Sequence, residues 1–158
     1  ENLFCFNDPQ FNRLFPFYIL LNGDMQITSV GKSMAKLIGD NTQTVFTNYF
    51  SIPRPYTPID HIDDLKALQN QLILLEYNSS KKILFRGQFE YLSESNEILF
   101  VGSPWFGSME QVTENNLLIW DFAHHDPLID LLHVLKSQEI TTDDLKQLLS
   151  TINKQKNE

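Results

Sequence analysis

The chain has 158 residues, of which 42% are hydrophobic and 12% aromatic, and its formal net charge is −8. A chain of this length and composition folds as one globular domain with appendages, which excludes a disordered protein. The acidic balance argues against nucleic acid and against a membrane surface as partners, because binding phosphate groups needs clustered Lys and Arg.

Signatures of several other protein classes are missing from the sequence. No apolar run approaches the ~18 residues of a membrane-spanning helix, and there is no basic-then-apolar leader. The single cysteine, Cys5, excludes an internal disulfide and a multi-thiolate metal site. There is no Gly-rich phosphate loop, no His-Glu-x-x-His and no nucleophile elbow. We therefore expect a cytoplasmic protein, or part of one, that is not an enzyme.

The chain begins with a predicted helix and hairpin. Asn-Asp-Pro at 7–9 is typical of a helix start, because an Asx side chain caps the first turn and proline suits it. Apolar residues then recur at helical spacing until Pro16 ends the helix. The apolar run 17–21 predicts a strand, and Asn-Gly at 22–23 predicts a turn into a return strand over 25–30.

Short helices and one strand are expected next. Residues 31–38 predict a short helix that Gly39 closes, and 45–50 hold another short helical candidate. The proline-rich segment 52–58 is not expected to form a regular element. A turn or two of helix over 60–68 and a strand over 71–77 follow.

A long hairpin is the strongest structural signal in the chain. Residues 83–92 alternate between apolar and polar, which is typical of a strand with one buried face. Residues 98–105 are apolar at consecutive positions, so both faces of that strand lose water. The polar stretch 93–97 between them has the length of a hairpin connection. A short helix over 108–114 and an apolar segment over 117–120 that returns to the core complete this part.

The C-terminal segment predicts two short amphipathic helices. The first begins at Asp126-Pro127 and carries a leucine stripe over 128–135. The second begins at 141–144, Thr-Thr-Asp-Asp, and repeats the helical spacing over 145–152. Each is too short for a coiled coil of ~3–4 heptads, and we interpret them as an output or pairing element.

The order of elements predicts an α+β fold with a five-stranded antiparallel sheet and short helices on one face, the architecture of a PAS domain. We expect an N-terminal flanking helix over residues 1–15, the PAS-like domain over 16–122 and C-terminal signalling helices over 123–158.

Short motifs along the chain resemble the haem-NO-binding-associated family. They are Phe-Pro-Phe at 15–17, Phe-Ser-Ile-Pro-Arg-Pro at 50–55, Phe-Arg-Gly-Gln at 85–88 with Tyr-Leu at 91–92, Leu-Phe-Val-Gly-Ser-Pro at 99–104 and His-Asp at 125–126. In this order and spacing they extend the resemblance over about residues 8–135.

The resemblance implies a dimerising, PAS-like relay module that does not hold haem itself. Such modules lie beside the haem domain of soluble guanylate cyclases and occur in bacterial histidine kinases. The implied partners are a haem-based NO or O2 sensor and a kinase-type output domain, because the 141–155 helix is more similar to the bacterial members. Guanylate cyclase activity belongs to relatives, since nothing similar to a cyclase domain is present.

His124, His125 and Asp126 are the only cluster that suggests metal binding or phosphoacceptor chemistry. Adjacent side chains point in different directions, no third ligand is evident, and Pro127 follows at once. We expect instead that Asp126 caps the following helix, with Pro127 at its first position, while His125 satisfies backbone groups at a corner.

Two arginines are candidates for contacts with a partner. Arg86 lies on the polar face of the hairpin, where it recognises a partner's carboxylate or pairs with an acid such as Glu90; we favour the second. Arg54 stands between two prolines on a stiff segment and anchors this segment to the core or to a partner.

An aromatic set on the hairpin lines either a cofactor pocket, as in many PAS domains, or the core. Its members are Phe85, Phe89, Tyr91, Phe100 and Trp105. We expect a filled core with no bound cofactor or metal, because aromatic rings are the largest apolar groups available. Cys5 precedes the domain and is not placed for flavin chemistry.

The outer face of the sheet and the N-terminal helix are expected to form a homodimer interface, because an uncovered apolar face is a liability and twofold pairing is its commonest cover. The predicted interface residues are Phe11, Leu14, Phe15, Phe17, Ile19, Leu21, Leu99 and Val101. The predicted signal-output residues are Leu128, Leu131, Leu132 and Leu135.

Two functional hypotheses follow. The first is a non-catalytic dimerising relay between a gas sensor and an output domain. The second is a PAS domain that directly senses a small molecule or cofactor, which would leave the purified protein coloured or carrying a ligand.

Overall fold

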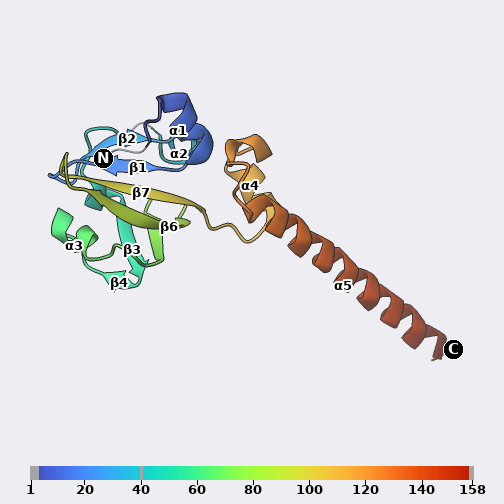
Figure 1. The fold of residues 1–158 in the computed structure, drawn as a ribbon. Coiled ribbons are helices and arrows are strands. Elements are labelled where there is room, and N and C mark those ends of the chain that lie inside the picture. The colour runs from blue at the N-terminus through green and yellow to red at the C-terminus, as the bar shows by residue number, and fades with distance from the viewer. Residues whose placement is uncertain (1–3, 40, 157–158) are drawn as a thin grey trace.

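In residues 4–39 and 41–156, which the computed structural model describes, seven strands form one antiparallel sheet (Figure 1). The strands are β1 (Ile19–Leu21), β2 (Ile27–Val30), β3 (Phe50–Arg54), β4 (Tyr56–Thr57), β5 (Ile73–Tyr77), β6 (Ile83–Leu92) and β7 (Glu97–Pro104). Their order across the sheet is β2-β1-β7-β6-β5-β3-β4. The predicted α+β class and antiparallel sheet are confirmed.

Five α-helices and two short 3-10 helices complete the described chain. The α-helices are α1 (Asp8–Leu14), α2 (Lys32–Ile38), α3 (Ile62–Lys66), α4 (Met109–Glu114) and α5 (Leu128–Lys156); the 3-10 helices are η1 (Phe46–Asn48) and η2 (Ile119–Asp121). No described helix is both long and apolar enough to cross a membrane. Residues 1–3 and 157–158, the ends of the two predicted flanking segments, lie outside the described residues.

The predicted count of five strands is wrong, because two more strands form in the proline-rich segment. The five expected strands are present in the order β2-β1-β7-β6-β5, and β3 and β4 extend the sheet beyond β5. Pro53 is tolerated because the β3–β5 register shifts between Ser51 and Arg54, where the ladder is irregular. Pairing across the sheet therefore outweighs the missing N–H of the proline.

The β6–β7 hairpin confirms the predicted long hairpin, with pairs running from Leu92 and Glu97 to Phe85 and Pro104. Gly87 and Gly102 face each other at its centre. A Cβ atom on either glycine would lie 2.8 Å from the ring of Phe100, so the two glycines make room for this ring.

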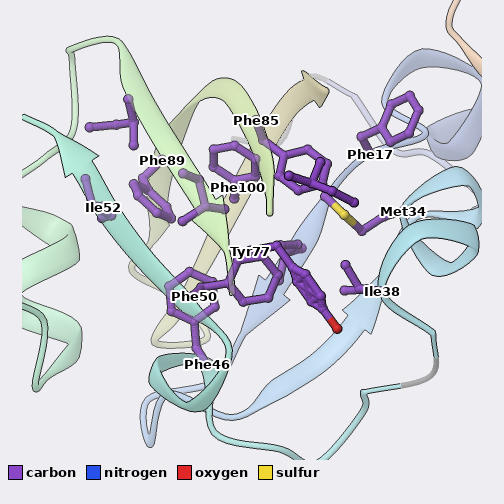
Figure 2. Close-up of a cluster of buried hydrophobic side chains, with 14 of the residues drawn as sticks. Phe17, Met34, Ile38, Phe46, Phe50, Ile52, Tyr77, Phe85, Phe89 and Phe100 are labelled. Atoms are coloured by element: carbon purple, nitrogen blue, oxygen red, sulfur yellow. The ribbon is translucent and has the colours of Figure 1, made fainter. Parts of the chain in front are cut away.

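The core lies on one face of the sheet and packs aromatic rings among Ile, Leu and Met side chains (Figure 2). Phe46 stacks on Phe50 with ring centroids 4.8 Å apart, and Phe89 lies 5.3 Å from Phe100. The largest fully buried side chains are Phe17, Phe46, Phe85, Phe89, Phe100, Ile19, Leu21, Ile27, Met34, Ile52, Leu65 and Ile73. The predicted aromatic set divides: three of its members are core residues, Tyr91 is half-buried, and Trp105 is 48% exposed.

The C-terminal segment is one helix of 29 residues, so the prediction of two short helices is wrong. The hydroxyls of Thr141 and Thr142 donate to the carbonyl oxygens of Ser137 and Gln138, each at 2.9 Å, inside the helix. The two threonines therefore bond to the preceding turn and do not cap a new helix. The helix extends away from the sheet (Figure 1).

Candidate functional site

The start of α5 is fixed to the sheet by Asp126. One carboxylate oxygen accepts the hydroxyl of Ser103 on β7 at 2.5 Å, and the other accepts the backbone N–H of Leu128 at 3.0 Å. The predicted capping role of Asp126 is confirmed. The same carboxylate therefore bonds both to β7 and to the first turn of α5.

The end of α1 meets the same junction through His125. Its Nε2 donates to the carbonyl oxygen of Leu14 at 2.7 Å, and its ring lies edge-on to Phe15 with centroids 6.0 Å apart. The prediction that His125 satisfies a backbone group at a corner is confirmed. His124 is exposed and lines a different hollow, beside α1 and α2. No group of three or more His, Cys, Asp and Glu residues able to hold a metal ion occurs in the described part of the chain.

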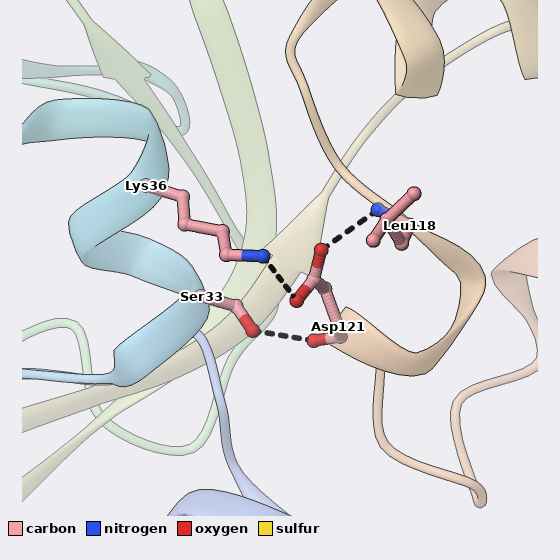
Figure 3. A network of polar contacts seen from close by, with 4 residues as sticks. All are labelled: Ser33, Lys36, Leu118 and Asp121. Carbon is pink, nitrogen blue, oxygen red and sulfur yellow. Dashed lines mark hydrogen bonds and ion pairs between the residues drawn. The ribbon is translucent and has the colours of Figure 1, made fainter.

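A second connection joins α2 to the segment before α5 (Figure 3). The Lys36 ammonium donates to one Asp121 carboxylate oxygen at 2.7 Å, and the N–H of Leu118 donates to the other at 2.7 Å. Ser33 donates its hydroxyl to the carbonyl oxygen of Asp121 at 2.6 Å. The carboxylate is nearly buried, so these bonds replace the water it loses. This network holds η2 in place. Of the segment 117–120 that we expected to return to the core, only Leu117 is buried, and Leu118, Ile119 and Trp120 are exposed.

A groove of about 670 Å³ lies beside the junction. Its lining includes Leu14 and Phe15 at the end of α1, Leu72 before β5, and Arg86 and Val101 on the outer face of the sheet. It also includes the His-Asp-Pro segment at 125–127. The groove therefore touches α1, the sheet and the start of α5 at one place.

Arg86 supplies the positive charge of this groove. Its guanidinium carbon lies 5.6 Å from the ring centroid of Trp105, and the ion pairs found among the described residues do not include it. The favoured pairing with Glu90 is therefore absent from the described residues, and a role in binding a partner stays a prediction. Arg54 is exposed at the end of β3, and its role also stays a prediction.

Three of the predicted interface residues are placed inside the protein. Phe17, Ile19 and Leu21 are fully buried in the core, so they have no surface to offer a second chain and this part of the prediction is corrected. Phe11, Phe15, Leu99 and Val101 are half-buried, and Leu14 is exposed. For these five the interface stays a prediction. Leu20, which pairs with Leu99 on the outer face, was missed because a wholly apolar strand gives no sign of which residues face out.

The four predicted output residues divide in the same way. Leu128 and Leu132 are buried against the domain, whereas Leu131 and Leu135 are exposed. Further along α5 more apolar residues are exposed; these are Val134, Ile140, Leu145, Leu148, Leu149 and Ile152. The first turn of α5 therefore belongs to the domain, and the rest carries an apolar surface away from it.

Comparison with known proteins agrees with this architecture. The family model described as "Heme NO binding associated" matches residues 6–82 and 76–157. The guanylate cyclase soluble subunit alpha-1 of Rattus norvegicus is 27% identical over 161 residues, and that of Bos taurus is 29% identical, each over 96% of this chain. The head-specific guanylate cyclase of Drosophila melanogaster is 24% identical over 92% of the chain.

The chain spans only about a fifth of the length of these relatives, 22% for the two alpha-1 subunits and 23% for the Drosophila protein. The similarity is therefore to one segment of each cyclase. Because the family model covers nearly the whole described sheet and α5, the chain belongs to the haem-NO-binding-associated family.

Proposed function

We propose that the chain is a non-catalytic relay domain of a cytoplasmic signalling protein, in which it dimerises and couples a haem-based NO or O2 sensor to an output domain. Its family and its guanylate cyclase relatives support a signalling-associated domain. The proposed kinase-type output rests on the resemblance of residues 141–155 to bacterial members alone, whereas the matched relatives reported above are cyclases.

The observation that carries the proposal is the apolar stripe of α5. Residues 131, 135, 138, 142, 145, 149 and 152 follow heptad spacing, and all but Gln138 and Thr142 are Leu or Ile. All seven are exposed in the single chain. A helix of this length spans ~44 Å, and such a stripe is stabilised by packing against another helix. A second copy of the same helix is the simplest partner.

The junction supports the relay part of the proposal. Asp126 and His125 connect α5 to β7 and to α1, and Asp121 connects the preceding segment to α2. A change in how α1 or the sheet packs against a partner would therefore reach the base of α5 through hydrogen bonds. In this scheme the sensor acts on the α1 side, and α5 carries the response to the output domain.

Size-exclusion chromatography with light scattering, with an absorbance spectrum across the peak, tests this proposal. We expect a colourless dimer at high micromolar concentration, and a weaker dimer for the Leu145→Asp, Leu149→Asp double variant. Both side chains are exposed in the single chain, so the variant keeps its fold. A monomer at this concentration would refute the proposed dimer, and a coloured monomer would favour a domain that senses a cofactor directly.

A further inference from the structure

A continuous row of aromatic rings runs along α1 and ends in the groove. Successive ring centroids lie 6.4 Å apart from Phe4 to Phe6, 6.2 Å from Phe6 to Phe11 and 5.2 Å from Phe11 to Phe15. Phe15 itself lines the groove. Phe4 and Phe6, on the segment 4–7 that precedes α1, are 76% and 47% exposed. We call this segment the N-terminal arm. Two large rings exposed side by side indicate a contact surface for another molecule.

The groove has the chemistry to receive such rings. Its apolar lining comes from Leu14, Leu72 and Val101, and its cation is Arg86. The planar guanidinium stacks on aromatic faces, and it already lies over the ring of Trp105 at 5.6 Å. With no ion-pair partner among the described residues, Arg86 also attracts an acidic segment, and the arm leads directly into Asp8.

The arm does not lie in its own groove, because the two are at opposite ends of α1. The arm precedes the helix, whereas Leu14 and Phe15 of the groove are at its C-terminal end. Seven helical residues separate the two ends by ~10 Å. If two α1 helices pack side by side and antiparallel about Phe11, each arm comes to the groove of the other chain. This contact is self-complementary and closed, as twofold symmetry requires.

We propose that two copies of this chain exchange their N-terminal arms, with Phe4 and Phe6 of each copy seated in the groove of the other. The exchange rests on the proposed dimer and adds its geometry. It places a second chain against the junction of α1, β7 and α5, where a change in dimer packing reaches Asp126 and His125 directly. The single Cys5 lies between the two rings, so the arm carries its own chemical probe.

Disulfide trapping tests the exchange. The Leu72→Cys variant places a second thiol in the groove wall at an exposed position, so the fold is retained. Under oxidised glutathione we expect a covalent dimer on a non-reducing gel. The matched control is Tyr56→Cys, which is 84% exposed and lies outside the groove lining; it should give no covalent dimer. Replacing Cys5 by Ser in the Leu72→Cys protein should abolish the cross-link.

Each other outcome overturns the exchange in a distinguishable way. A disulfide within one chain would mean that the arm reaches its own groove. It would give the mass of a single chain with no free thiol and no bound glutathione. Equal cross-linking of the Leu72→Cys and Tyr56→Cys variants would mean random collision. A dimer by light scattering without the Leu72→Cys cross-link would refute the exchange and leave the relay dimer standing, whereas a monomer would refute both.

Discussion

The sheet domain and the part of α5 beyond Leu132 contain the same kinds of apolar residues, but the domain buries them and the helix leaves them exposed. In the domain, side chains such as Phe89 and Ile73 are completely buried between the sheet and the segments that cover it. Beyond Leu132, the leucines and isoleucines of α5 stay largely exposed. The domain therefore completes its own core, whereas the helix carries an apolar surface that none of the other described residues buries.

The largest expected effect comes from two neighbouring leucines at the boundary between these regions. Leu132 is 1% exposed and Leu131 is 46% exposed. Leu132→Asp should lower the free energy of unfolding by at least ~3 kcal/mol, because it removes core packing and buries a carboxylate without partners. Leu131→Asp should change it by less than ~0.5 kcal/mol in dilute solution, as is typical of an exposed site. Urea unfolding followed by circular dichroism measures both.

The same pair separates folding from signalling. In the full-length protein, Leu131→Asp should weaken dimerisation and uncouple input from output while the domain stays folded. If Leu131→Asp instead unfolded the domain as strongly as Leu132→Asp, the boundary between core and output surface would be misplaced. Leu131→Ala is the control for charge, and we expect it to have a smaller effect on the dimer than Leu131→Asp.

A medium effect is expected at Asp121, which belongs to the domain although the residues just before it are exposed. Asp121→Ala leaves the N–H of Leu118 and the ammonium of Lys36 without their shared acceptor, and should cost about 1–3 kcal/mol of stability. Lys36→Met removes the ion pair, but the Asp121 carboxylate keeps the N–H of Leu118; because the Lys36 side chain is itself half-exposed, this change should cost less than Asp121→Ala, about 1 kcal/mol. Thermal unfolding ranks the two; a larger loss for Lys36→Met would contradict the network in Figure 3.

The sequence predicted most of the fold where a pattern has only one structural solution. Alternation over β6 gave the correct long hairpin, and Asn7 caps α1 with Gln10 in a reciprocal pair of hydrogen bonds. The apolar run that contains β1 was different, because without alternation it gave no sign that Ile19 and Leu21 face the core. The predicted interface failed at these residues for that reason.

Short sequence motifs predicted some details wrongly, because contacts with other parts of the chain decide these details. Asn-Gly at 22–23 correctly predicted the hairpin of β1 and β2, but the positive φ of 64° falls on Met25, and the Asn22 side chain instead accepts the N–H groups of Asp24 and Gln26. The threonines at 141–142 have the sequence of a helix start, yet the helix continues through them. The groove could not have been predicted, because its walls come from segments far apart in the chain.

The smallest expected effect is the pH dependence of the contact that braces α5 against α4. The Lys136 ammonium donates to the Glu110 carboxylate at 2.7 Å. This hydrogen bond is the main reason that the pKa of Glu110 lies below its ordinary value and the pKa of Lys136 above its own. The lowered pKa of the carboxyl group stabilises the folded chain at pH values above the ordinary pKa of Glu, and this stabilisation is lost as the pH falls through the pKa in the folded chain. The raised pKa of the ammonium group stabilises the folded chain at pH values below the ordinary pKa of Lys, and this stabilisation is lost as the pH rises through the pKa in the folded chain.

The brace should therefore hold across the neutral range and weaken only at acid pH below the ordinary pKa of Glu110 and at alkaline pH above that of Lys136. Both side chains are exposed, so the effect should be slight and should shrink further in high salt. Thermal unfolding of the wild type and of Glu110→Gln at several pH values measures it. The unfolding temperatures of the two proteins should differ at neutral pH and become equal in acid. A difference that grows as the pH falls would show that Glu110 stabilises the chain by some route other than its charge.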